Sequence, residues 1–108
     1  MAMITTPSQK AYTIEDITLT NNAVANNTTA VGNFASVCNG HTQELGDKTF
    51  TYTLVAGNGN GNNNLFTINA NGSLAFANNA TAGNKSIRVR STSYRGAIRE
   101  EEFTITVT

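Results

Sequence analysis

The chain has 108 residues, and its seven basic and seven acidic side chains give a formal net charge of zero. Charged residues make up only 13 %, about half the usual share, so we expect neither a basic surface for nucleic acid nor a charged solvating tail. No apolar stretch approaches the roughly 20 residues of a membrane helix, so we expect no membrane insertion. Cys38 is the single cysteine, which excludes an intrachain disulfide.

The N-terminal part differs from the rest. Residues 1–13 contain the only proline, Pro7, and carry no hydrophobic period, so they predict an extended arm. They also lack the basic start and apolar run of a secretory signal. We expect the arm to precede one folded domain over residues 14–108. The many threonines and asparagines favour strands joined by turns.

The first predicted strands begin directly after the arm. In the run IEDITLT, Ile17 and Leu19 share one face, as the period of two in a half-buried strand requires. The run VGNFASV follows, and the odd spacing of Val31 and Phe34 predicts a bulge near Gly32.

The middle of the chain carries the strongest alternation. In TFTYTLV the apolar and threonine side chains alternate strictly, which predicts a strand. The loop Gly57–Asn64, GNGNGNNN, predicts neither strand nor helix. After it, Asn71-Gly72 joins the runs LFTI and SLAF, and this dipeptide predicts a hairpin whose two turn residues both have positive φ.

Two further runs close the chain. KSIRVRS predicts an inward face of Ile87 and Val89 with arginines outside, and EEFTITV predicts a last strand with three apolar inward positions. We expect the arginines and the glutamates at 100–102 to neutralise one another across neighbouring strands. Seven short strands without a helical period predict an all-β fold, a single antiparallel seven-stranded sandwich, with a small barrel as the alternative.

The order of these motifs resembles the bacterial cadherin-like, immunoglobulin-related surface modules. The resemblance covers Ile17 to Val107 and is most specific in Gly46–Gly57 and Asn64–Leu74. It implies a β-sandwich of the kind found in adhesins and other exported proteins, many of which bind Ca²⁺ between repeats.

The calcium ligands implied by the resemblance are not matched. Asn26 stands where the family often has an acid, and Thr92-Ser93 replaces its Thr-Asp pair. The acidic stretch after the second strand reads Val37-Cys38-Asn39-Gly40-His41, and only Asp47 stands where an acid is usual. Because Ca²⁺ needs about six to eight oxygen ligands, we expect no calcium and no other cofactor.

Two motifs could be mistaken for chemical sites. Cys38 and His41 supply half of a zinc site, but a structural zinc needs four ligands and no second Cys or His exists. GNGNGNNN leads into a predicted strand and no lysine follows it, unlike a phosphate-binding loop. We therefore expect a chain that is not an enzyme.

Contacts with partners are expected from the arm, the amide-rich loop and one late turn. The candidate contact residues are Pro7, Tyr12, Asn58, Asn60, Asn62, Asn63, Tyr94 and Arg95.

Two functional hypotheses follow for a non-catalytic module. The first is a protein on the exterior of a virus particle, decorating a head or tail through contacts with protein subunits or weak contacts with surface glycans. The isolated module without an export signal motivates it. The alternative is an excised cadherin-like repeat of a bacterial adhesin, at the cell surface or secreted.

Overall fold

The computed structural model describes residues 13–39, 50–94 and 96–108. These residues form eight strands and one short 3₁₀ helix, without an α-helix. None of their helices is long and apolar enough to cross a membrane. The elements are β1 (Thr13–Leu19), β2 (Ala23–Val24), β3 (Ala30–Asn39), β4 (Phe50–Leu54), η3 (Asn63–Leu65), β5 (Phe66–Ile68), β6 (Ser73–Phe76), β7 (Gly83–Ser93) and β8 (Ile98–Val107).

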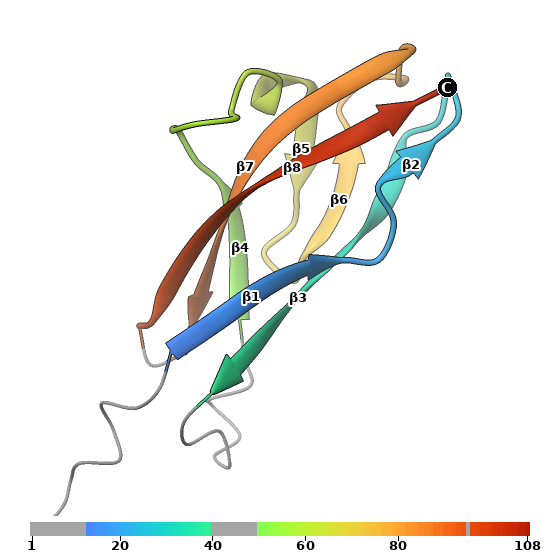
Figure 1. Cartoon of the computed structure of the whole chain (residues 1–108). Coiled ribbons are helices and arrows are strands. Elements are labelled where there is room, and N and C mark those ends of the chain that lie inside the picture. Colours follow the sequence, from blue (N-terminus) through green and yellow to red (C-terminus); the bar gives the residue numbers. More distant parts are fainter. Residues whose placement is uncertain (1–12, 40–49, 95) are drawn as a thin grey trace, which may run out of the picture.

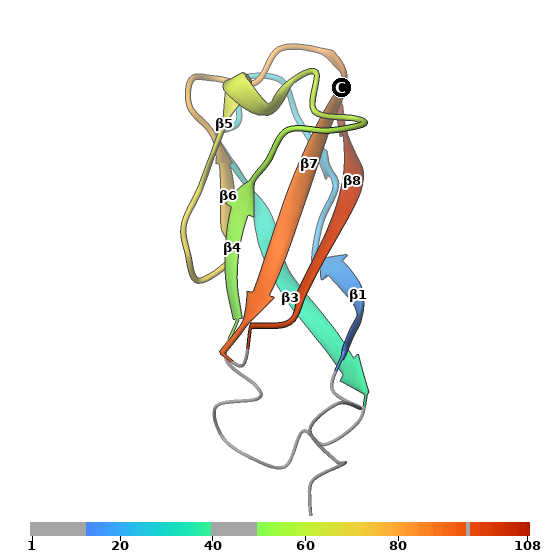
Figure 2. The same cartoon turned by 90° about the vertical axis from the view of Figure 1, so that its left-hand side faces the viewer.

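The strands form two sheets of four, in the orders β1-β3-β6-β5 and β2-β8-β7-β4 (Figure 1). The expectation of an all-β sandwich is therefore confirmed. Figure 2 shows β4, β7 and β8 side by side, and the long β7–β8 ribbon runs from the C-terminal end of the molecule to the opposite end.

Two features of the predicted sandwich need correction. The chain forms an eighth strand, β2, because after β1 it crosses to the other sheet and pairs there for two residues. β2 pairs with β8 in parallel, so the sandwich is not purely antiparallel. The crossing continues in the direction of β1, and backbone bonds from Thr106 N–H to Asn22 O and from Thr108 N–H to Val24 O fix the pairing.

The core lies between the sheets and follows the predicted alternation. Ile87, Val89 and Ile105 are completely buried, and Phe34 packs against Tyr52 and Phe103 with ring centroids 5.9 and 5.1 Å apart. The predicted bulge in β3 is confirmed, because the register with β6 shifts between Ala30 and Gly32. The cluster of buried residues comprises Ile17, Val31, Phe34, Tyr52, Phe66, Leu74, Phe76, Ala80, Ile87, Val89, Ile105 and Val107.

The β5–β6 hairpin is confirmed, but its turn differs from the prediction. Gly72 has a φ of 105°, whereas Asn71 is not among the described residues with positive φ. The N–H of Gly72 bonds to Asn69 O, and the N–H of Asn69 bonds to Ser73 O, so the loop holds three residues rather than two. The turn therefore needs only one left-handed residue, and glycine supplies it.

Candidate interaction surface

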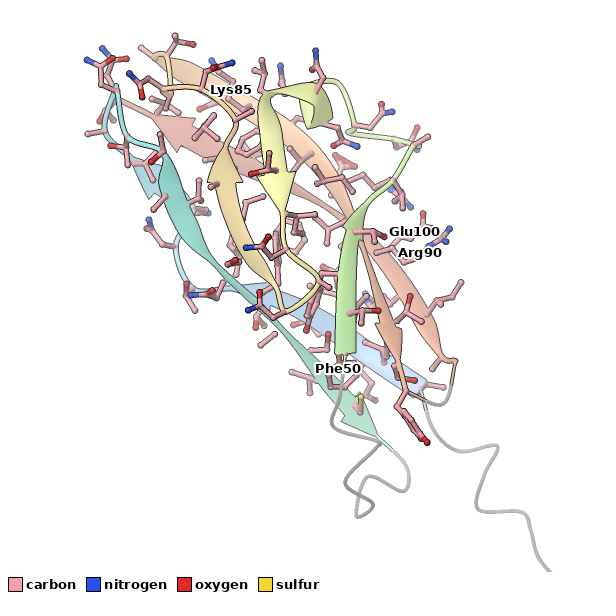
Figure 3. All side chains as sticks on the ribbon, turned by 180° about the vertical axis from the view of Figure 1, so that it is seen from behind. Phe50, Lys85, Arg90 and Glu100 are labelled. Carbon is pink, nitrogen blue, oxygen red and sulfur yellow. The ribbon has the colours of Figure 1, made fainter. Side chains whose placement is uncertain are left out.

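Paired charges cover the outer face of β7 and β8. Arg90 lies directly across from Glu100, and its Nε and Nη2 donate to Glu100 Oε2 at 2.9 and 2.6 Å. Arg88 Nε donates to the other carboxylate oxygen at 3.0 Å. The hydrogen bonds from Arg90 and then those from Arg88 lower the pKa of Glu100. Figure 3 shows Arg90 and Glu100 side by side on this face, so the predicted neutralisation across strands is confirmed here.

The amide-rich loop lies against these charges, and its glycines allow the approach. A Cβ built on Gly57 would lie 2.8 Å from Arg88 Cδ, and one built on Gly59 would lie 2.7 Å from Glu102 Cβ. Both glycines also have positive φ, at 137° and 82°. Arg88 Nη1 donates to Asn58 O at 3.2 Å. The loop can therefore pack closely on the sheet because Gly57 and Gly59 have no side chains.

Asn62 and Asn63 use their side chains to extend the sheet. Ser86 N–H donates to Asn62 Oδ1 at 2.8 Å, and Arg88 N–H donates to Asn63 Oδ1 at 3.0 Å. Asn63 Nδ2 donates in turn to Val55 O at 2.8 Å. These amides occupy the edge of β7 just beyond the end of β4, where the ladder would otherwise lose its partner. Sequence reasoning placed both asparagines among partner contacts and missed this role, because their bonds reach residues far along the chain.

The remaining amides of the loop face solvent. Asn58 and Asn60 are exposed, whereas Asn62 and Asn63 are half-buried. Of the four predicted contact residues in the loop, Asn58 and Asn60 are therefore the two whose side chains present free amide surface. That they contact a partner stays a prediction.

Three hydroxyl groups, of Ser36, Tyr52 and Ser91, lie close together between the two sheets. Ser36 Oγ lies 2.8 Å from Tyr52 Oη and 2.6 Å from Ser91 Oγ, and Ser91 is completely buried. Within the described ranges no imidazole or carboxylate hydrogen bonds to this trio. The three hydroxyls hydrogen bond to one another and so link β3 of one sheet to β4 and β7 of the other.

A second polar contact closes the side of the sandwich between β1 and β8. Glu101 Oε2 accepts the Ile17 N–H at 2.9 Å and the Arg99 Nε at 2.5 Å. The hydrogen bond with Glu101 raises the pKa of Arg99. The Glu101 carboxylate thus satisfies one backbone N–H of the edge strand β1 and links β1 to β8.

Apolar side chains are exposed at the β7–β8 turn. Tyr94 is 76 % exposed and Ile98 is 57 % exposed. Three hydrogen bonds join residues on the two sides of the turn: Ser93 N–H donates to Ala97 O at 2.8 Å, Gly96 N–H donates to Ser93 O at 2.9 Å, and Ala97 N–H donates to Ser93 Oγ at 3.0 Å. Tyr94, one of the predicted contact residues, is therefore exposed, and that it contacts a partner stays a prediction.

Several predicted residues lie outside the described ranges, namely Pro7, Tyr12, His41, Asp47 and Arg95. Cys38 is half-buried near the end of β3. Within residues 13–39, 50–94 and 96–108, no group of three or more His, Cys, Asp or Glu side chains could hold a metal ion. Comparison with protein-family models and with curated proteins found no match.

Proposed function

We propose that this chain is a non-catalytic interaction module with an immunoglobulin-like, cadherin-like sandwich, and that it contacts protein subunits of a larger assembly. The strand order supports the fold assignment. β1, β3, β6 and β5 correspond to strands A, B, E and D of an immunoglobulin sandwich, and β4, β7 and β8 correspond to C, F and G. β2 is the additional segment that crosses between the sheets.

The observation that carries the functional proposal is the exposed apolar surface on the β7–β8 turn. Tyrosine is enriched at the centres of protein interfaces, because it buries a large area at a small entropic cost. Here Tyr94 and Ile98 lie beside a turn that is closed by hydrogen bonds of Ser93, Gly96 and Ala97.

The ion pairs on β7 and β8 affect how a contact at this turn depends on charge. Because Arg88 and Arg90 both form ion pairs with Glu100, docking beside the turn meets charged groups that already have hydrogen-bond partners. Such a contact depends mainly on apolar area and varies little with ionic strength.

The assembly we propose is a virus particle, with the module on its exterior. Replacement of Tyr94 by alanine is expected to lower incorporation into particles at least tenfold, because a central interface tyrosine contributes about 2 kcal/mol or more. Tyr94→Phe keeps the ring and is expected to retain most incorporation. Quantitative mass spectrometry of purified particles measures both.

Three results would overturn parts of this proposal. Equal incorporation of Tyr94→Ala and the parent chain would remove the turn as the contact. Loss of folding in Tyr94→Ala, detected by circular dichroism, would show that the ring is structural. Absence of the chain from particles, together with its release from intact cells by protease, would favour the alternative, a repeat of a bacterial adhesin.

A further inference from the structure

A small pocket opens at the end of the sandwich remote from the Tyr94 turn. Its volume is about 210 Å³, and it lies between η3 and the segment that joins β6 to β7. Tyr94 follows Lys85 by nine positions, which corresponds to about 30 Å of extended chain. Figure 3 shows Lys85 at the end opposite Phe50, the residue that pairs with the last position of β7. The lining consists of Leu65, Phe76, Asn78, Asn79, Thr81 and Lys85.

The pocket is lined by both apolar and polar side chains. Phe76 is buried and packs on Phe66 with ring centroids 4.2 Å apart, so its position is fixed. Asn78, Asn79 and Thr81 are exposed. An amide and a hydroxyl can each both donate and accept hydrogen bonds. This combination fits a ligand with one apolar face and several hydroxyl groups at its edge.

Lys85 gives the pocket a single positive charge. Its Nζ donates to Ala82 O at 3.2 Å, which uses one of the three donors of an ammonium group. Gly83, with a φ of 118°, turns the chain beside it. No carboxylate lines the pocket, and in the described part of the chain no ion pair joins Lys85 to an acid. The charge is therefore available to one anionic group of a ligand.

The pocket has room for about one ring. At about 30 Å³ per molecule, 210 Å³ corresponds to roughly seven waters, and it is smaller than the pockets of drug-sized ligands. A pyranose ring has an apolar face of C–H groups for Phe76 and Leu65 and hydroxyls for the amides. A carboxylate on the ring would meet Lys85.

From this geometry we propose that the pocket binds the carboxylated pyranose ring of an acidic sugar, such as a hexuronic acid. The inference rests on the proposed function, in that it names a ligand class for a module that presents its surface to other structures. It adds a site at the end remote from the Tyr94 turn. The affinity belongs to a single ring and is expected in the millimolar range, so avidity would come from many copies.

The test compares two sugars that differ only in the carboxylate. The full chain, labelled with ¹⁵N, is titrated with methyl β-D-glucuronide and with methyl β-D-glucoside, and amide shifts are followed by NMR. We expect saturable shifts confined to the amides around the pocket, with the glucoside at least tenfold weaker. Lys85→Gln is expected to weaken glucuronide binding about tenfold, because a charge-assisted hydrogen bond is lost.

Matched variants separate local from general effects. Lys85→Arg keeps the charge and is expected to retain binding within about threefold. Arg90→Gln removes one positive charge from the same strand, β7, at a position that does not line the pocket, and is expected to leave the sugar titration unchanged. A well-dispersed amide spectrum establishes that each variant is folded.

Several outcomes would overturn the inference. These are the absence of saturable shifts at the pocket, equal affinity for both sugars, or N-acetylglutamate binding as tightly as the glucuronide, which would indicate a protein carboxylate as the ligand. The Tyr94→Ala variant keeps this test distinct from the proposed function. Unchanged sugar binding in that variant supports a separate site, whereas parallel loss in a folded variant argues against one.

Discussion

Replacement of Asn63 by alanine tests whether the amide-rich loop completes the sheet. The substitution removes two hydrogen bonds, from Asn63 Nδ2 to Val55 O and from Arg88 N–H to Asn63 Oδ1. A hydrogen bond contributes about 1 kcal/mol net, and the half-buried backbone groups left behind gain water only in part. The expected loss is therefore about 2 kcal/mol in the free energy of unfolding.

Urea unfolding followed by circular dichroism measures this loss. With a denaturant slope of about 1–2 kcal/mol per molar, the midpoint is expected to fall by about 1–2 M. The melting temperature should fall by about 8–12 °C. Asn58→Ala is the matched control, because Asn58 lies in the same loop and is exposed. It should change stability by less than about 0.5 kcal/mol. Equal midpoints for the two variants would refute the role assigned to Asn63.

Two further predictions concern the same face. Gly59→Ala is expected to cost at least about 1 kcal/mol, because φ is 82° and the new Cβ would lie 2.7 Å from Glu102 Cβ. Gly61→Ala, with nothing within 4 Å, should be neutral or slightly stabilising, and similar urea midpoints for both would contradict the loop packing. Because the folded-state pKa of Glu100 is lowered, its stabilisation is present above the unfolded pKa of about 4.3 and is lost as pH falls through the folded pKa. Glu100→Gln should therefore flatten the fall of melting temperature below about pH 5, and an unchanged slope would contradict the prediction.

Alternation in the sequence was sufficient to predict the central strands. Threonines and arginines alternate with apolar residues in β4 and β7, and the apolar residues pack in or against the core as expected. The same alternation did not predict two polar side chains. Ser91 is fully buried, and Glu101 points toward β1. A polar residue at an inward position interrupts the apolar period and so gives no signal of its own. Their partners come from other strands, and a single sequence does not indicate them.

Very short strands and hydrogen bonds between distant parts of the chain could not be predicted from the sequence either. β2 has two residues, too few for any period, and its pairing depends on where β8 lies. Asn63 resembles its loop neighbours in sequence, and its bond to Arg88 spans 25 positions. The exposure of Tyr94 was predictable because a tyrosine in a turn has no strand face to bury it. The pocket beside Lys85 was not, since its lining comes from three separate segments.

The turn between β5 and β6 has a consequence for how the protein opens. Ala70 O accepts the N–H of Tyr52 at 3.1 Å, and Gly72 O accepts the N–H of Phe34 at 2.8 Å. A single turn therefore bonds to a strand of each sheet. Separating the layers must break the backbone hydrogen bond between Tyr52 and Ala70 as well as apolar contacts, so the Tyr52 amide, on the edge strand β4, should exchange its hydrogen only through an opening that detaches β4 from this turn.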